Sequence, residues 1–515
     1  MNRWGACLPL LLVCFDVASS VRPYFTAAVF EHARQSNVTE DTPAVIISKN
    51  LAFYQKATEV AKTKGVDIIV FPEYGIFPPL ERKELKPYLE VIPDPKNINV
   101  NPCNERQTYQ NRPILYALSC MAQQNEIVVV ANMGGIQSCE GENECPADGS
   151  FHLNTNVVFD KNGTMLLRYY KEHLFYEFGM DLPREPQDSV FTTDFGTFAT
   201  FICFDFEFSK MTEVAQREDL EVDAVAFSTM WVDAALQRSS VQAWESWSLG
   251  NNATLLAANI QLPGYLAVGS GIFNGADGPL AYTFDPDGVS KLVVATVPRR
   301  GYSSTLSSPN ASIIKITLNS TEESHNDGSS VPTVCSLKVL GDAKDVYKDY
   351  RCHELSTSNY SFVKLIDDSD HIKACINGVC CSLKYTSDGM RENFYLVVYN
   401  GTIDYYTRYS FCEQTCMVVR CEPNGTNPCA SFPLRSETLF YSVQLTADFS
   451  AKHIYPAVVN SGMRLTPLNK WNHGIEKTSS DVYKGYIDFK SPSGEALLSA
   501  GLRGRCYDRD PPYER

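Results

Sequence analysis

Three residues with reactive side chains stand in segments that could bring them to one cleft. Cys203 follows an apolar run at residues 198–202, and Glu73 follows another at residues 66–71, so both are expected at strand ends. A thiolate is a strong nucleophile, a carboxylate can accept and return a proton, and the ammonium of Lys171 can stabilise an oxyanion. Taken singly, each has an ordinary explanation as a buried core cysteine, an exposed loop glutamate or a solvated surface lysine. Together they supply the groups that nucleophilic catalysis through a thiol requires.

The number of cysteines favours a free thiol at Cys203. Seventeen are present, and Cys7 and Cys14 fall in a predicted signal peptide, so the mature chain keeps an odd number. The cysteines after residue 300 are even in number and can pair among themselves, which leaves the unpaired thiol in the first half. Four cysteines of that half could form two local disulfides: Cys103 with Cys120, and Cys139 with Cys145. Their connectivity stays open, since four cysteines allow three pairings.

The first twenty residues have the order of a signal peptide: Arg3, an apolar core at residues 8–15, and small residues at 18–20. No later stretch reaches the roughly 18 apolar residues of a membrane helix, and the polar C-terminus lacks the hydrophobic tail of a lipid-anchor signal. We therefore expect a secreted, extracellular protein with residues 1–20 removed and no membrane anchor. Sequons predict glycosylation at Asn37, Asn162, Asn252, Asn310, Asn319, Asn359, Asn400 and Asn424.

The charge of the chain argues against two classes of partner. Lys and Arg number 45 against 60 Asp and Glu, for a formal net charge of −15. Phosphate backbones and anionic lipid surfaces would repel this charge, so we expect no nucleic-acid partner and no docking to a membrane surface. No Gly-rich phosphate loop, metal-spaced histidine cluster or redox Cys-x-x-Cys stands out, so we expect no cofactor and no metal.

The chain divides into two halves with different patterns. In residues 21–300, short apolar runs alternate with helical segments, which predicts a layered α/β domain. Strands are predicted at residues 26–30, 66–71, 127–131, 156–159, 198–204, 224–227 and 254–258, and helices at 46–64 and 240–250. A linker is predicted at 301–334, and residues 335–515 read as a disulfide-stapled β domain. Within it, Asn400-Gly401 predicts a hairpin turn between strands at 394–399 and 402–409.

The motifs around the three reactive residues resemble the nitrilase superfamily of carbon–nitrogen hydrolases, whose sites hold Glu, Lys and Cys in this chain order. Glu73 stands in strand-Pro-Glu, Lys171 in Arg-Tyr-Tyr-Lys before a Leu-Phe pair, and Cys203 in Cys-Phe-Asp after a hydrophobic strand. A closer resemblance, over nearly the whole mature chain, is to the vanin and biotinidase branch. The segments that carry it are residues 26–32, 88–95, 101–104, 154–160, 269–272 and 377–381.

The resemblance implies an αββα nitrilase-type sandwich followed by a smaller, disulfide-rich all-β domain. It also implies that Cys203 is the nucleophile, that Glu73 is the proton acceptor and donor, and that Lys171 stabilises the oxyanion of a tetrahedral intermediate. A positive lysine beside the thiol would also lower the pKa of Cys203.

Several further residues are weaker candidates. Glu177 lies where nitrilase relatives often carry a second glutamate, although its segment is one residue shorter than in vertebrate vanins. The backbone N–H of Phe204 is the expected second oxyanion donor. Trp231 could wall a substrate cleft, but core packing explains it better. Asp205 is expected to tie down the turn at the cysteine.

The resemblance implies an amidohydrolase that cleaves pantetheine to pantothenate and cysteamine. The nearest enzymatic alternative is cleavage of biotinyl amides. An alternative of another class is a secreted vanin-like salivary binding protein that inhibits platelet aggregation through an integrin or fibrinogen receptor at the cell surface. The intact Glu, Lys and Cys set and the lack of an Arg-Gly-Asp motif argue against that alternative. We expect a monomer with a small-molecule amide substrate.

Overall fold

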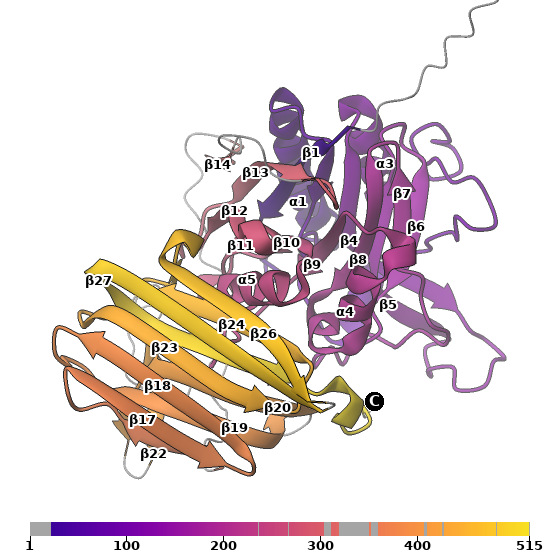
Figure 1. The fold of residues 1–515 in the computed structure, drawn as a ribbon. Helices are drawn as coiled ribbons and strands as arrows, with labels where there is room; N and C mark the ends of the chain where they lie inside the picture. Colours follow the sequence, from indigo (N-terminus) through magenta and orange to yellow (C-terminus); the bar gives the residue numbers. More distant parts are fainter. Residues whose placement is uncertain are drawn as a thin grey trace, which may run out of the picture.

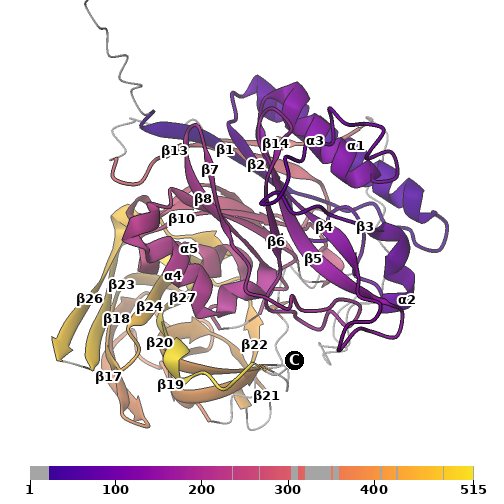
Figure 2. The same cartoon turned by 90° about the vertical axis from the view of Figure 1, so that its right-hand side faces the viewer.

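The computed structural model describes residues 22–234, 236–265, 267–302, 311–318, 350–351, 359–405, 409–424, 427–479 and 481–513. Two β-sheets and five α-helices form a sandwich in the first part of the chain, and the rest forms a region of β-strands beside it (Figures 1 and 2). Within the described residues, no helix has the length and apolar character needed to cross a membrane.

The first sheet has the strand order β14-β13-β1-β2-β4-β5-β6, with β3 beside β4. Its strands are β1 (Tyr24–Glu31), β2 (Ile68–Val70), β3 (Leu89–Glu90), β4 (Val128–Ser138), β5 (Ser150–Phe159), β6 (Met165–Tyr170), β13 (Lys291–Pro298) and β14 (Ser312–Lys315). The second sheet has the order β12-β11-β10-β9-β8-β7. Its strands are β7 (Val190–Thr193), β8 (Gly196–Ile202), β9 (Ala224–Thr229), β10 (Thr254–Asn259), β11 (Ser270–Asn274) and β12 (Pro279–Thr283).

Helices cover the outer faces of both sheets (Figures 1 and 2). The α-helices are α1 (Pro43–Thr63), α2 (Arg82–Leu85), α3 (Pro113–Asn125), α4 (Ser209–Gln216) and α5 (Ser240–Asn251). The 3₁₀ turns are η1 (Lys86–Tyr88), η2 (Cys203–Glu207), η3 (Glu218–Leu220), η4 (Pro263–Tyr265), η5 (Gly275–Asp277), η6 (Leu468–Lys470) and η7 (Tyr507–Arg509). Thr42 caps α1 by accepting a hydrogen bond from the Val45 N–H, and Pro43 occupies the first turn, where a missing N–H costs nothing.

The pleat of β1 explains the four layers. Successive side chains of a strand point to opposite faces of its sheet. Ala27 therefore packs with Phe201 of the second sheet in the core between the sheets, whereas Ala28 packs with Tyr54 of α1 in the core beneath the helices. The α/β sandwich predicted from the sequence is confirmed in this arrangement.

The β region contains a ten-stranded sheet and a small three-stranded sheet. Its strands are β15 (Tyr350–Arg351), β16 (Ser361–Lys364), β17 (Ser369–Ile376), β18 (Val379–Ser387), β19 (Phe394–Tyr405), β20 (Tyr409–Arg420), β21 (Glu422–Asn424), β22 (Asn427–Pro433), β23 (Leu439–Phe449), β24 (His453–Asn460), β25 (Arg464–Leu465), β26 (Trp471–Ser479) and β27 (Val482–Arg505). The long strand β27 pairs with β23 and β26 along its first part and with β20 and β24 along its last part. It thereby lies at the centre of the larger sheet and joins its two halves.

Disulfides gather in the β region, as predicted. Its described disulfides are Cys375–Cys380, Cys381–Cys416, Cys412–Cys506 and Cys421–Cys429. Cys335 and Cys352 fall outside the described residues. In the sandwich, Cys103 pairs with Cys120 and Cys139 with Cys145, so the local pairing considered above is confirmed. Cys203 is the free cysteine of the part of the chain that the structure describes.

A buried ionic cluster crosses the interface between the sandwich and the β region. Glu207, at the end of η2, accepts a hydrogen bond from Arg503 of β27 at 2.6 Å, and Arg238 of the sandwich donates to Glu413 of β20 at 2.6 Å. The Arg505 guanidinium donates to the backbone carbonyl of Glu207 at 2.8 Å. These five residues, all buried, are named the interface cluster below. Because charges buried in pairs are costly to leave unpaired, the cluster makes the two parts depend on each other.

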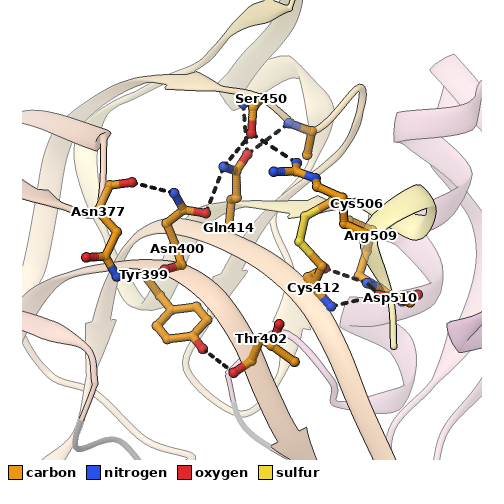
Figure 3. Close-up of a disulfide and its surroundings, with 12 residues drawn as sticks. Asn377, Tyr399, Asn400, Thr402, Cys412, Gln414, Ser450, Cys506, Arg509 and Asp510 are labelled. Atoms are coloured by element: carbon orange, nitrogen blue, oxygen red, sulfur yellow. Dashed lines mark hydrogen bonds and ion pairs between the residues drawn. A yellow bond between two sulfur atoms is a disulfide. The ribbon is translucent and has the colours of Figure 1, made fainter. Parts of the chain in front are cut away.

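One sequence prediction in the second half is wrong. The predicted turn at Asn400-Gly401 lies inside β19, which continues to Tyr405 and pairs with Tyr409 at the start of β20. The Asn400 amide instead donates to the Asn377 carbonyl at 2.6 Å, and its oxygen accepts from Gln414 at 2.9 Å (Figure 3). Contacts made across the sheet therefore outweigh the local turn preference of Asn-Gly.

The predicted linker at 301–334 is not wholly a linker. Part of it, Ser312–Lys315, forms β14 and extends the first sheet by pairing antiparallel with β13. Ile313 and Ile314 pair there with Val293 and Leu292, so the sheet continues past the proposed boundary at residue 300. Residues 303–310 and 319–334 of that range, like the predicted signal peptide at 1–20, lie outside the described residues.

The described sequons differ in exposure. The exposed ones are Asn37, Asn162, Asn252 and Asn359, whereas Asn400 is half-buried. Asn424 lies in β21, and Asn310 and Asn319 fall outside the described residues. Glycosylation at these positions stays a prediction.

Candidate active site

The reactive residues predicted from the sequence come together at the ends of strands from both sheets. Glu73 follows β2, Lys171 follows β6, and Cys203 follows β8. The predicted strand at 198–204 ends at Ile202, so the cysteine begins the η2 turn rather than lying in the strand. This places each functional group on a rigid element with its side chain free to face the others.

Glu73 is buried and held by three donors. Its Oε1 accepts hydrogen bonds from Lys171 Nζ at 2.7 Å and from Asn154 Nδ2 at 2.8 Å. Its Oε2 accepts from the backbone N–H of Met230 at 2.9 Å. The side chain is 2% exposed, so water contributes little to its position. Its two oxygens are thereby fixed toward different neighbours, one toward the lysine and one toward the strand end at Met230.

Glu177 is the second carboxylate of the cluster. Lys171 Nζ binds its Oε1, while its Oε2 accepts from Asn154 Nδ2 and from the Tyr74 hydroxyl, both at 2.7 Å. The backbone N–H of Phe175 also donates to Oε1 at 3.2 Å. The shorter segment therefore still delivers a glutamate to the lysine. Glu73, Lys171 and Glu177 are named the active-site cluster below.

Cys203 is bound to the same strand end as Glu73. Its Sγ–H donates to the Met230 carbonyl at 3.7 Å, and the N–H of that residue donates to Glu73. Asp205 accepts from the Ile202 N–H at 3.1 Å and from the Tyr169 hydroxyl at 2.9 Å. Asp205 therefore ties down the turn. Met230 acts as a shared anchor for the thiol and for the carboxylate.

Three residues of the site have left-handed backbone conformations. The φ angle is +52° at Tyr74, +50° at Tyr176 and +44° at Cys203. Side chains other than glycine rarely adopt this region, which costs about 1–3 kcal/mol for each residue. Two of these residues adjoin the glutamates, and the third is the cysteine itself. Strain of this kind persists where the surrounding structure compels it, and it collects at functional sites.

Burial and charge shift the pKa values of the three reactive groups. Burial raises the pKa of Glu73 above its ordinary value, Lys171 opposes this shift and Glu177 adds to it. Burial alone would lower the pKa of Lys171, but Glu177 and Glu73 raise it well above its ordinary value. Burial and the charge of Glu73 also raise the pKa of the Cys203 thiol, and Lys171 only partly opposes them.

Lys171 does lower the pKa of Cys203, as expected, but burial and the charge of Glu73 outweigh its contribution. One lysine faces two carboxylates, so the net charge around Cys203 disfavours a thiolate. The raised pKa of the thiol favours its protonated form, and the pKa of the nearby Glu73 carboxylate is raised as well. A thiol in this environment would need a general base in order to act as a nucleophile.

The weaker candidates are placed as follows. The Phe204 ring packs on Phe175 and Tyr409, with centroids 4.9 and 4.7 Å apart, and its backbone belongs to the η2 turn. Its role as an oxyanion donor stays a prediction. Trp231 is buried in the core between the sheets, and its indole N–H donates to the Arg238 carbonyl at 2.8 Å. This position matches core packing.

A cavity of about 350 Å³ borders Glu177, whereas Glu73, Lys171 and Cys203 are not among its lining residues. It is lined by residues of the Glu177 loop and of the β region, among them Leu174, Glu177, Phe178, Arg184, Tyr409 and Tyr513. Its walls combine aromatic rings with a few charged groups, which is the usual make-up of a small-molecule site. The β region therefore forms part of the approach to Glu177.

Sequence reasoning missed Asn154, which donates to both glutamates. A signal was present, because Asn154 and Asn156 interrupt a strand in which every residue is buried. Buried polar side chains need partners, and Asn132 supplies another by donating to the Asn154 oxygen at 2.6 Å. The anchoring role of the Met230 backbone left no signal in the sequence, because any residue carries an N–H and a carbonyl.

Comparison with known proteins agrees with this geometry. Residues 33–253 match the family model for carbon–nitrogen hydrolases, and residues 350–510 match that for the vanin C-terminal domain. The chain is 29% identical to human pantetheinase over 516 residues, covering 97% of this chain and 92% of that protein. It is 30% identical to bovine biotinidase over 545 residues, covering 99% of this chain and 100% of that protein. The chain therefore belongs to the vanin and biotinidase branch of the carbon–nitrogen hydrolases and is a hydrolase of amide C–N bonds.

Proposed function

We propose that this protein hydrolyses the amide bond of pantetheine, releasing pantothenate and cysteamine. The observation that carries the proposal is the free, buried Cys203 thiol beside a carboxylate–lysine–carboxylate cluster, in a chain that matches pantetheinase over nearly its full length. That combination supplies a nucleophile, a base and a cation for amide cleavage.

The reaction has two halves. In the first, Glu73 takes the proton of Cys203 as the sulfur attacks the amide carbonyl, and Lys171 stabilises the oxyanion that forms. The C–N bond then breaks as Glu73 returns the proton to the leaving amine, which leaves a thioester on Cys203. In the second half, Glu73 takes a proton from water, hydroxide attacks the thioester, and the carboxylic acid leaves as the proton returns to sulfur.

The Glu73 contacts support this double use of one carboxylate. Its Oε2 lies on the Met230 N–H, and Met230 also accepts from the thiol. Its Oε1 lies on Lys171. The proton acceptor, the thiol and the cation are therefore in contact through one chain of hydrogen bonds. Lys171 bridges both carboxylates and so keeps its charge close to the reacting carbonyl.

The test is release of cysteamine from pantetheine by the purified protein, with Cys203→Ala as the variant. We expect activity in the wild type and loss of at least about 10³-fold in the variant. The control variant is Glu126→Gln, which changes an exposed carboxylate paired with Lys62. This variant is expected to leave the rate of hydrolysis unchanged. Activity that survives in Cys203→Ala would contradict the thioester mechanism.

Biotinyl amides are the second candidate substrate, because bovine biotinidase matches the chain over its whole length. Both substrates would use the same thiol, so they differ only in the groups that the cavity beside Glu177 must accept. Measuring kcat/KM for pantetheine and for a biotinyl amide on the same preparation decides between them. A preference for the biotinyl amide of tenfold or more would replace pantetheine as the proposed substrate.

The proposed site of action is extracellular. The signal-peptide pattern at residues 1–20 and the disulfides of the described residues support secretion, since disulfides persist in oxidising compartments. Expression of the full chain in a eukaryotic cell should give a protein in the medium whose first residue is Val21. Sequencing of the N-terminus checks this expectation.

A further inference from the structure

The loop that carries Glu177 is bound by two tyrosines of the β region. The Tyr513 hydroxyl donates to the Leu174 carbonyl at 2.8 Å and accepts from the Leu174 N–H at 2.9 Å. The Tyr409 hydroxyl donates to the Leu174 carbonyl at 3.1 Å and accepts from the Tyr176 N–H at 3.0 Å. Each hydroxyl thus uses its one proton and one lone pair on the loop backbone.

These contacts replace the partners that regular structure would provide. The loop after β6 contains no helix or strand until β7, and a half-buried backbone without partners would be costly. Tyr176, whose N–H is bound, has a left-handed φ and directly precedes Glu177. The tyrosines therefore fix the backbone directly before Glu177. The direction of the backbone at this point sets the direction of the Glu177 carboxylate.

Both tyrosines lie close in sequence to a junction between β20 and the C-terminal tail, which a disulfide and hydrogen bonds hold together. The disulfide Cys412–Cys506 links the beginning of β20 to the residue after β27 (Figure 3). Asp510 accepts from the Cys412 N–H at 2.7 Å and from Arg505 Nη2 at 2.8 Å. Tyr409 lies just before this junction on β20, and Tyr513 lies just after it in the C-terminal tail. The junction keeps the two hydroxyls at a fixed separation.

We propose that Tyr409 and Tyr513 are positioning residues for amide hydrolysis. Through these two tyrosines, the β region keeps the Glu177 carboxylate in hydrogen-bonding contact with Lys171 and Asn154. The proposal rests on the hydrolysis of an amide at the active-site cluster. The β region then completes the active site of the sandwich, because the two hydroxyls that position Glu177 come from the second half of the chain.

The variants Tyr409→Phe, Tyr513→Phe and their double test the proposal with the rings kept in place. The rings line the cavity beside Glu177, so KM should change by less than about threefold. The hydroxyl bonds are lost, so we expect kcat to fall by about tenfold in the double variant, through a misplaced Glu177 carboxylate. Hydrogen–deuterium exchange of residues 172–180 should become faster.

Tyr507→Phe is the matched control. Its hydroxyl lies in the same C-terminal tail but bonds to the Tyr455 hydroxyl at 2.9 Å, not to the Glu177 loop. Its kcat and the exchange of residues 172–180 should equal those of the wild type. Thermal midpoints of all variants separate loss of positioning from loss of fold, and the single variants serve if the double does not fold.

Unchanged kcat in the double variant overturns the proposal, whatever the exchange. An equal loss of kcat in Tyr507→Phe also overturns it, because the effect would then come from a loosened tail. A wild type that hydrolyses no pantetheine defeats the proposed function instead. In that case the exchange of residues 172–180 and the rate of Cys203 alkylation by iodoacetamide, compared between the double variant and Tyr507→Phe, still decide the positioning role.

Discussion

Two buried ionic clusters flank the η2 turn, and they differ in their balance of charge. The active-site cluster has one lysine for two carboxylates, whereas the interface cluster has three arginines for two glutamates. Glu73, Lys171 and all five residues of the interface cluster are buried, and the side chain of Glu177 is 7% exposed. The clearest difference between the clusters is therefore the ratio of cations to carboxylates.

The difference in charge sets the direction of the pKa shifts. Burial raises the pKa of Glu73, and its single lysine does not cancel the shift. Burial would raise the pKa of Glu207 too, but Arg503, Arg238 and Arg505 together lower it to about 2. A buried carboxylate with too few neighbouring cations can exchange a proton. A buried carboxylate with surplus cations around it stays ionised and forms structural ion pairs. In the proposed mechanism, glutamate thus does chemistry in the active-site cluster, whereas it joins two parts of the fold in the interface cluster.

Glu73→Gln should have the largest effect on activity. The amide has nearly the same shape but accepts no proton, so we expect kcat to fall by about 10³-fold or more, ~4 kcal/mol in the barrier. The thermal midpoint should fall slightly, because both oxygens of Glu73 accept from N–H donors and the NH2 group of glutamine would face one of them. Steady-state rates and the thermal midpoint check both parts. A rate within tenfold of the wild type would show that another group is the base.

Glu413→Gln should have the reverse effect, on stability rather than chemistry. It leaves three buried arginines with too few carboxylates, at a cost of about 3–5 kcal/mol in the free energy of unfolding. Urea denaturation measures this loss, and kcat below the unfolding transition should stay within a few fold of the wild type. Glu126→Gln removes an exposed ion-pair partner and should cost under about 1 kcal/mol. Equal losses in the two variants would contradict a special role for the interface cluster.

The sequence was a good guide where the cause is local. The strand at residues 66–71 and the helix at 46–64 follow from apolar spacing, and β2 and α1 confirm them with shifted bounds. The active-site residues could be found because strand ends and motif order are properties of short segments. Counting cysteines placed an unpaired thiol in the first half of the chain, and the two local pairings considered there would leave it at Cys203.

The rest depended on contacts between distant parts of the chain. Asn400-Gly401 carries a strong turn signal, yet pairing with β20 and the bond to Asn377 keep it in a strand. The raised pKa of Cys203 depends on its burial and on two carboxylates that outweigh one lysine, an arrangement in space that no segment reveals. Tyr409 and Tyr513 looked like ordinary residues of a β domain, because the loop that they bind lies more than two hundred residues away.

The two clusters should also lose their functions at different pH values. Glu73 must be ionised to take the thiol proton, so the acid limb of kcat/KM should lie above pH 4.5, its ordinary pKa. Glu207 has a lowered pKa, so its contribution to stability is complete above about pH 4.5 and is lost as the pH falls toward 2. At pH 4 the protein should therefore be folded and inactive, with activity recovered on return to pH 7. Circular dichroism and rate measurements on one sample check this, and unfolding that accompanies the loss of activity would contradict it.

Glu177→Gln should have the smallest effect and brings the charge ratio of the active-site cluster closer to that of the interface cluster. The glutamine can still accept from Lys171, so we expect kcat to fall by only about tenfold, ~1.4 kcal/mol. With one carboxylate per lysine, the pKa of Glu73 loses the contribution by which Glu177 raises it. The acid limb of kcat/KM should then move to lower pH, while the interface cluster and the thermal midpoint change little. A limb that stays in place would mean that burial alone, rather than the surplus of carboxylates, sets the basicity of Glu73.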